Sequence, residues 1–311
     1  MSGGGPPNPR ARLAVSGARA MTAERLDSRP RGDVVKGTVF ATLLFLAISL
    51  ALVGLAILLG DAILDGRGRL DSGLITEGSS SDPEKAGLRS AIIGTLWIIG
   101  FVILLIAPIG IGAALFLEEY ANKDSRLARL VEVNIQNLAA VPSIIYGLLG
   151  LAFIARGPLS LGFVVLTASM TLALLVLPIV IIAAREAIRA VPPSIRAGSL
   201  ALGATRWQTI RHQVLPAAIP GIATGVILAV SRAIGETAPL IPLGAATFVT
   251  FDPSGPMSGF TAMPLQIFNW AKQPSDDFRV LAAAGIVTLI LLLVLLNSFA
   301  IWLRNRYEQR W

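Results

Sequence analysis

Two side chains of opposite charge, Arg232 and Glu236, stand four residues apart within an otherwise apolar stretch of the sequence. A charge deep in a membrane costs about 2.5–3.5 kcal/mol on insertion scales, so we expect Arg232 to face a partner or a watery cavity. Its planar guanidinium suits an oxyanion, because two parallel donors can bind two oxygens at once. Ser231 and Thr237 add hydroxyl groups beside it. This cluster predicts part of a path for an anionic substrate.

The residues that follow Arg232 are typical of a helix that breaks within the membrane. Gly235, Pro239 and Pro242 all weaken a helix at this point. Broken helices in transporters expose backbone groups to the substrate. Arg232 lies about 18 residues into an apolar span, and the four-residue spacing places Glu236 on the same helix face.

The composition excludes most classes of soluble protein. Of the 311 residues, 54% are hydrophobic and 14% are charged, whereas a soluble domain carries about 25% charged residues. The chain has no cysteine and one histidine, His212, which excludes disulfides, thiolate metal sites and a histidine metal cluster. We expect no metal site and no catalytic residue, because no nucleophile and base are paired. The net charge of +7 favours membrane orientation over nucleic-acid binding.

Six apolar segments are each long enough to cross about 30 Å of hydrocarbon as a helix. They lack the two-residue alternation of a membrane β-barrel. The predicted fold class is therefore an all-α integral membrane protein with six transmembrane helices. The predicted spans are Thr38–Gly60, Ala91–Leu117, Val133–Ala155, Leu161–Ala184, Val214–Ala246 and Val280–Leu303.

The distribution of Lys and Arg predicts the orientation of these helices. With the N-terminus in the cytoplasm, 18 of the 26 basic residues fall on the inside and 7 in the outside loops, with Arg232 left within a span. We therefore expect a multi-pass protein of the bacterial inner membrane with both termini in the cytoplasm. The predicted parts are a disordered tail over 1–36, a first helix over 37–60, an extracytoplasmic loop over 61–88, a transmembrane domain over 89–303 and a tail over 304–311.

A second basic group lies at the inner end of the fourth predicted span. Arg185 and Arg189 fit the role of membrane anchors under the positive-inside rule, which is the interpretation we favour. The alternative is that they line the exit of an anion path.

The segment between the fourth and fifth spans, residues 190–216, predicts two short helices at the cytoplasmic face. Pro192 and Pro193 suit a helix start, and a helix is expected over Ser194–Leu202. Gly203 ends it, and Thr205 can cap the next helix. That second helix carries an apolar face made of Trp207, Ile210 and Val214.

This segment resembles the coupling loop of bacterial ABC importer permeases, which reads E-A-A, three residues, Gly, and then I-x-L-P. Gly203 and Val214-Leu215-Pro216 match that pattern, whereas Ala197-Gly198-Ser199 replaces the acidic triplet. The resemblance implies a type I ABC importer permease fold and docking of a separate ATPase. Without the triplet, docking should rely on shape and apolar contact. The residues expected at the contact are Leu200, Gly203, Ala204, Thr205, Arg206 and Trp207.

Two further stretches, Asn137–Gly147 and Ser231–Leu240, resemble the phosphate-specific transport permeases. The form Gly-Glu-Thr-Ala-Pro-Leu at 235–240 is closer to the PstA-type subunit than to its PstC-type partner. The resemblance implies phosphate import by a complex with a PstC-type permease, a PstB-type ATPase dimer and an external PstS-type phosphate-binding protein. No phosphate-binding loop occurs in this chain, so ATP and Mg²⁺ would be held by the ATPase subunit alone.

Three alternatives remain open. Glu236 could accept a hydrogen bond from the O–H group of hydrogen phosphate, which sulfate lacks, or it could only neutralise Arg232, which is the interpretation we favour. The cargo could be another oxyanion such as molybdate or sulfate. A stand-alone secondary transporter is a third possibility, although such proteins usually carry more intramembrane acids or an inverted repeat.

Overall fold

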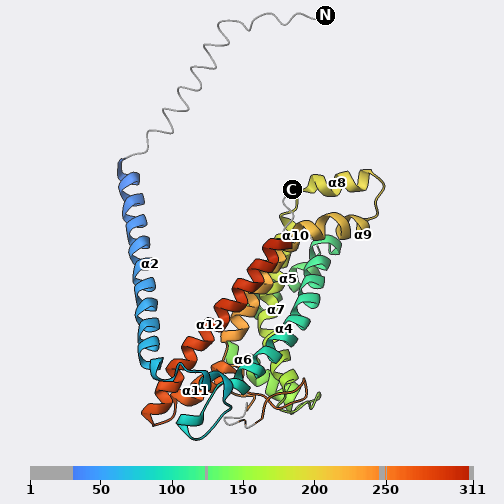
Figure 1. Cartoon of the computed structure of the whole chain (residues 1–311). Helices are drawn as coiled ribbons and strands as arrows, with labels where there is room; N and C mark the ends of the chain where they lie inside the picture. The colour runs from blue at the N-terminus through green and yellow to red at the C-terminus, as the bar shows by residue number, and fades with distance from the viewer. Residues whose placement is uncertain (1–30, 123–124, 245–248, 250, 308–311) are drawn as a thin grey trace, which may run out of the picture. The chain divides into compact units, whose positions relative to one another are not determined.

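The computed structural model describes residues 31–122, 125–244, 249 and 251–307 (Figure 1). Most of the predicted N-terminal tail, residues 308–311 and Ala246 lie outside these residues. The described residues form helices and connecting segments, with a single isolated β-bridge between Val164 and Gly259. The all-α prediction is therefore confirmed for the described part of the chain.

The chain divides into two compact units, residues 1–61 and 62–311. Helix α2, Arg31–Gly66, contains the first predicted span. It carries no charged residue between Lys36 and Asp61, and its apolar stretch is long enough to cross a membrane.

The second unit is built around four long helices. They are α4 (Arg89–Leu115), α7 (Val165–Arg189), α10 (Leu215–Gly235) and α12 (Asp276–Tyr307). Helix α7 lies in the middle, against both α4 and α10, and more of its residues are buried than in the other long helices. Val102 and Ile106 of α4 pack with Leu172 and Val176 of α7, and all four side chains are at most 1% exposed. This apolar core holds the bundle together.

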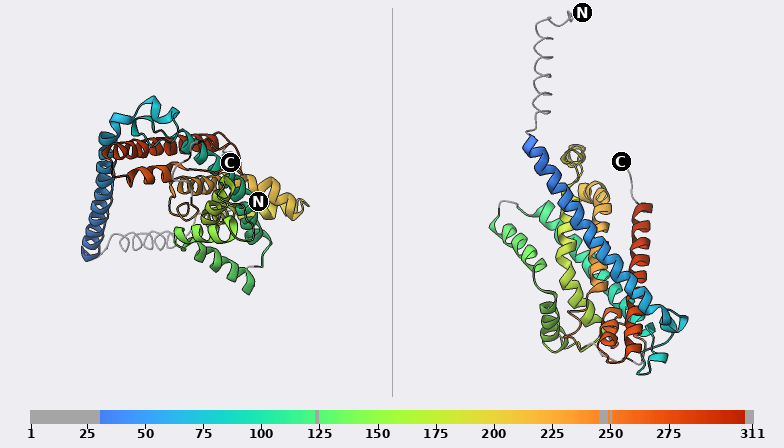
Figure 2. Two further views of the ribbon diagram at one scale, coloured as in Figure 1. Left: turned by 90° about the horizontal axis from the view of Figure 1, so that it is seen from below. Right: turned by 90° about the vertical axis from the view of Figure 1, so that its left-hand side faces the viewer.

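Two ends of the bundle can be distinguished (Figures 1 and 2). Helix α8, Pro193–Ala201, and α9, Arg206–Thr209, lie at one end, which we call the α8 end. Helix α11, Met263–Ala271, lies at the other, which we call the α11 end. The short helix α3, Ser72–Thr76, leads into this same end. Thr95 Oγ1 of α4 accepts a hydrogen bond of 2.9 Å from the Met263 backbone N–H, which fixes α11 to the bundle.

The third predicted span is wrong as one continuous helix. Its residues form α5 (Arg126–Ala139) and α6 (Ser143–Leu149), which continues as a wider π turn over Gly150–Ala155. The two parts are bent by 103°. Pro142 explains the break, because it has no backbone N–H to donate and disfavours helical geometry at the residue before it. The long apolar helices number five among the described residues, or six if the bent pair counts as one span.

The fifth predicted span is wrong at both ends. The helix runs without a break from Arg206 through α9 and a π turn over Ile210–Val214 into α10, and it stops at Gly235. The second coupling helix and the fifth span are therefore one helix of 30 residues. The stop at Gly235 follows from the weak helix propensity of glycine and the prolines that come after it.

Candidate functional site

Arg232 and Glu236 form an ion pair at the α11 end of the bundle. Arg232 lies in the last turn of α10, and Glu236 is the capping residue with extended backbone. The Arg232 Nε to Glu236 Oε1 distance is 3.2 Å. The predicted span continues to Ala246, whereas the helix ends at Gly235, so Arg232 lies near the end of its helix and not in the middle of a longer one. A cation in the last turn of a helix is favoured by the partial negative charge of the unpaired carbonyl groups.

The pair leaves most of the guanidinium available. The Arg232 side chain is 45% exposed and that of Glu236 is 19% exposed. Among the described residues, Glu236 is the one side chain that pairs with Arg232, and its carboxylate contacts only the Nε atom of the guanidinium. The two terminal amino groups of Arg232 can therefore donate to an external oxyanion while Glu236 remains bound.

The Thr237–Leu240 segment forms a turn directly after the ion pair. The Leu240 N–H donates to the Thr237 carbonyl oxygen at 3.0 Å, and the Leu240 side chain is 1% exposed. Pro239 of this turn lies against Gly147 of α6, where a Cβ atom would come within 2.7 Å of the Pro239 Cα. Two stretches more than 80 residues apart in sequence, both singled out by their pattern, are thus in direct contact.

Tyr146 sets the bend that brings Gly147 to Pro239. Its hydroxyl donates to the Leu138 carbonyl oxygen at 2.7 Å, across the break at Pro142. The Tyr146 side chain is 4% exposed. The Leu138 carbonyl oxygen also accepts the Val141 N–H at 3.2 Å, while the residue four positions later is Pro142, which has no N–H to donate.

Ser231 does not join the Arg232 group. Its Oγ lies 2.6 Å from Asn297 Oδ1 on α12 and 2.7 Å from the Ile227 carbonyl oxygen. The hydroxyl therefore links α10 to α12. Thr237, in contrast, immediately follows Glu236 and is half-buried.

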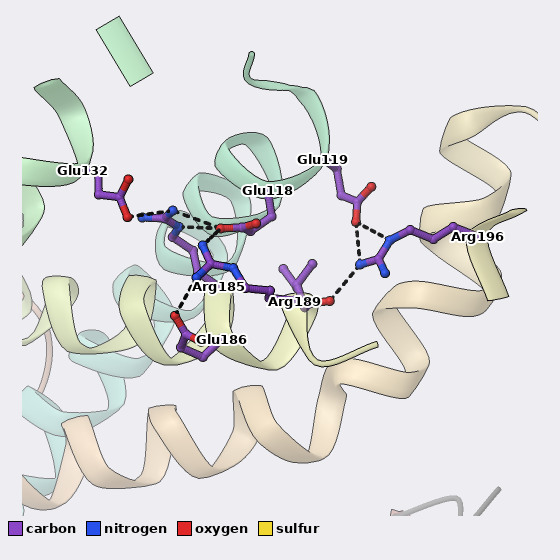
Figure 3. A network of polar contacts seen from close by, with 8 residues as sticks. Glu118, Glu119, Glu132, Arg185, Glu186, Arg189 and Arg196 are labelled. Atoms are coloured by element: carbon purple, nitrogen blue, oxygen red, sulfur yellow. Dashed lines mark hydrogen bonds and ion pairs between the residues drawn. The ribbon is translucent and has the colours of Figure 1, made fainter. Parts of the chain in front are cut away.

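Arg185 lies at the opposite end of the bundle from Arg232. Its Nη2 lies 3.0 Å from Glu118 Oε1 and 3.2 Å from Glu132 Oε1 (Figure 3). The Arg185 side chain is only 12% exposed and belongs to an ion network whose other members include the partly exposed Glu132 and Arg189. A polar cleft of about 90 Å³ adjoins this network, lined by Leu117, Ala128, Arg129, Glu132, Arg185 and Arg189.

The α8 end carries the predicted docking residues. Gly203 has a φ of +84°, the left-handed conformation that glycine adopts without strain, and it ends α8. Thr205 and Gln208 form a reciprocal capping box at the start of α9. Leu202 is 91% exposed, and Leu200 and Trp207 are about half exposed. The local geometry predicted for this segment is confirmed, with α8 starting and ending one residue earlier.

One expectation about α9 is wrong. Trp207 does not share a buried face with Ile210 and Val214, which are 1% and 0% exposed. Trp207 is left on the outside with Leu200 and Leu202.

A large apolar groove of about 760 Å³ runs between α4, α10 and α12. Asn297 and Arg304 are its two polar lining residues, and the others are apolar. Such a surface cannot replace the hydration shell of an anion, so the groove is not the anion path. In the described part of the chain, no group of His, Cys, Asp and Glu side chains is arranged to hold a metal ion.

Three residues at the α8 end were not predicted from the sequence, although each contacts an arginine of another element: Glu118, Glu119 and Tyr120. The available signal was a pair of acidic residues directly after an apolar span, next to a cytoplasmic loop rich in arginine. Their partners lie more than 60 residues away in sequence, which is why no local pattern identified them.

Residues 106–311 match the family described as "Binding-protein-dependent transport system inner membrane component". The chain is 33% identical over 268 residues to the phosphate transport system permease protein PstA of Pasteurella multocida (strain Pm70), covering 86% of this chain and 93% of that protein. It is 34% identical over 279 residues to PstA 1 of Mycobacterium tuberculosis (strain CDC 1551 / Oshkosh), covering 87% and 89%. The solved structure of the MetNI methionine ABC transporter in an inward-facing conformation superposes with a TM-score of 0.55 at 18% identity, covering 71% of this chain and 96% of that chain.

Proposed function

The chain belongs to the inner membrane components of binding-protein-dependent transport systems, and on that premise we propose that it carries inorganic phosphate. It is a multi-pass inner membrane permease of an ABC importer with the type I importer fold, and not an enzyme. Membership implies an ATPase and a substrate-binding protein as partners. The identity of the cargo, the partners and the orientation are our proposals.

The exposed guanidinium of Arg232 carries the proposal for phosphate. It presents unpaired donors beside Thr237, at the end of a broken helix, in a permease whose relatives are named for phosphate transport. Glu236 holds Nε and leaves the amino groups to the anion. In this arrangement Glu236 neutralises Arg232 when no substrate is bound, and an oxyanion can bind the terminal amino groups without displacing Glu236 from Nε.

The α8 end faces the cytoplasm in our proposal, in agreement with the 18 basic residues assigned to the inside. The exposed Leu200, Leu202 and Trp207 then form the docking surface for an ATPase. We assign the partners as a PstB-type ATPase dimer that binds ATP and Mg²⁺, a PstC-type second permease and a PstS-type phosphate-binding protein on the outer side.

Arg185 is a second candidate for the anion path, at the inner exit. It lines the 90 Å³ cleft together with Arg129 and Arg189, so three guanidinium groups border one small polar space. Glu118 and Glu132 already bind Arg185, however, and an anion there would have to replace a carboxylate. The outer site at Arg232 therefore remains the better-supported substrate contact.

The deciding experiment reconstitutes this chain with its permease, ATPase and binding-protein partners in vesicles. ATP hydrolysis and uptake are measured with phosphate, sulfate and molybdate, each with and without the binding protein. Phosphate-stimulated hydrolysis that needs the binding protein supports the proposal. Stimulation by another oxyanion but not by phosphate would favour the alternative cargo, and uptake without any ATPase subunit would favour a secondary transporter.

A further inference from the structure

Three consecutive residues at the end of α4 each contact an arginine from a different element. They lie in the π turn Phe116–Tyr120 that follows α4. Glu118 binds Arg185 and Arg189 of α7, Glu119 binds Arg196 of α8, and the Tyr120 ring lies under the guanidinium of Arg206 in α9. The wider turn therefore joins a core transmembrane helix to both short helices of the α8 end.

The Glu119–Arg196 contact is the most direct of these links (Figure 3). Arg196 Nε and Nη2 lie 3.1 and 3.0 Å from Glu119 Oε1. The Arg196 side chain also donates to the carbonyl oxygens of Val191, at 2.5 Å, and Ile188, at 2.8 Å, at the end of α7. One guanidinium thus holds α8, α4 and α7 together.

Helix α8 has no buried residue, so apolar packing does not fix its position. Polar contacts hold α8 in place. Arg196 binds Glu119, and a contact of 2.9 Å between Ser199 Oγ and Thr209 Oγ1 connects α8 to α9. The Glu119 side chain is 9% exposed and that of Arg196 is 24% exposed. A pair this sheltered resists being pulled apart, since separation would leave a charge in a poorly hydrated place.

We propose that Glu119 and Arg196 are the positioning pair that passes movement of α8 to α4 and α7, with Glu118 and Tyr120 supporting the same turn. The proposal rests on the proposed docking of an ATPase against α8 and α9. In its resemblance to coupling loops, this chain lacks the acidic triplet on α8 and has Ala197-Gly198-Ser199 instead. The acidic groups that touch α8 come from the end of α4. The docking surface thereby gains a rigid connection to the membrane helices.

The first test is Glu119→Gln in the reconstituted complex, which keeps the size of the side chain and removes its charge. We expect ATP hydrolysis to continue while phosphate taken up per ATP falls by about 5- to 150-fold, the usual range of a coupling between two sites. In Glu119→Gln/Arg196→Gln, the loss should be no greater than in Arg196→Gln alone, because both changes break one link. Asp276→Asn is the matched control, because its ion pair with Arg279 is exposed and far from α8.

An unchanged uptake per ATP in a properly assembled Glu119→Gln complex would overturn the proposal, as would fully additive losses in the double variant. A second measurement, the distance between two spin labels, leaves Glu119 and Arg196 unchanged and so does not depend on whether the Glu119→Gln variant folds. The chain has no cysteine, so spin labels can be placed at Ala121→Cys after α4 and Ser194→Cys on α8. Their separation should stay the same with and without ATP, and a change above about 5 Å, one helical turn, would contradict the link.

The two proposals fail in different ways. If phosphate does not stimulate the complete wild-type complex, the proposed cargo is wrong, yet the label distance still tests whether α8 and the end of α4 move together. If phosphate is transported but the label distance changes on ATP binding, the cargo stands and the positioning pair is wrong.

Discussion

Gly147 and Pro239 lie so close that the backbone of one occupies the place where a side chain of the other would be. A Cβ on Gly147 would come within 2.7 Å of the Pro239 Cα and 2.9 Å of its carbonyl carbon. Both neighbours are backbone atoms, which cannot rotate away. The turn that carries Thr237 and follows the Arg232–Glu236 pair is thus positioned by the absence of a side chain on α6.

Gly147→Ala should therefore displace this turn and impair transport. We expect a loss of stability of about 1–3 kcal/mol, the usual cost of an added methyl group in a packed site. The melting temperature in detergent measures the loss of stability, and the uptake of phosphate measures the loss of transport. Gly112→Ala in α4 is the control, because nothing lies within 4 Å of its Cβ position. A Gly147→Ala protein as stable and active as Gly112→Ala would contradict the close contact.

Arg232→Gln should lower phosphate uptake by at least about tenfold, equivalent to about 1.4 kcal/mol. The change removes the charge and the exposed donors that we assign to the anion. Arg232→Lys should recover only part of the activity, because an ammonium group cannot bind two oxygens in a fixed plane. The control is Arg279→Gln, which removes an exposed arginine at the same end of the bundle. Equal losses in both variants would point to a general charge effect.

Glu236→Gln separates the two roles considered for this carboxylate. The Arg232 Nε to Glu236 Oε1 distance of 3.2 Å supports neutralisation, so removing the charge should strengthen oxyanion binding by Arg232. Phosphate and sulfate should gain alike, and the preference between them should remain. Competition of sulfate with phosphate uptake measures this preference. A reduced preference for phosphate would show instead that Glu236 accepts a hydrogen bond from the O–H group that hydrogen phosphate carries and sulfate lacks.

Local chemistry explains which parts of the fold could be predicted from the sequence. Long uncharged runs predict membrane helices, because no other backbone arrangement satisfies its polar groups in lipid except a closed barrel. Gly203 and Thr205 act within a few residues, and both have the predicted geometry. Pro142 offered a signal for the bend in the third span, but the residues on its two sides are together long and apolar enough for one span, which hides the break.

The contacts between distant segments were beyond prediction. Glu118 and Arg185 are 67 residues apart in sequence, and Glu119 and Arg196 are 77 apart. Each charge taken alone fits a solvated loop or a membrane anchor, and only the fold makes them partners, by placing α7 and α8 beside the turn that follows α4. The sequence therefore suggested a membrane anchor or an exit residue for Arg185, and it could not reveal that the side chain lies between two carboxylates.

Gly203→Val tests the predicted docking surface through backbone geometry alone. The φ of +84° is strained for a branched side chain, at a cost of about 1–2 kcal/mol, while open space surrounds the Cβ position. The change should therefore leave the membrane bundle intact and reorient α8 relative to α9, with Leu202 and Trp207 displaced from each other. We expect ATP hydrolysis to lose its dependence on phosphate and binding protein. Gly203→Asn, which tolerates this conformation far better, should stay close to the wild type. Full phosphate uptake by Gly203→Val would mean that docking of an ATPase does not depend on the conformation of this turn.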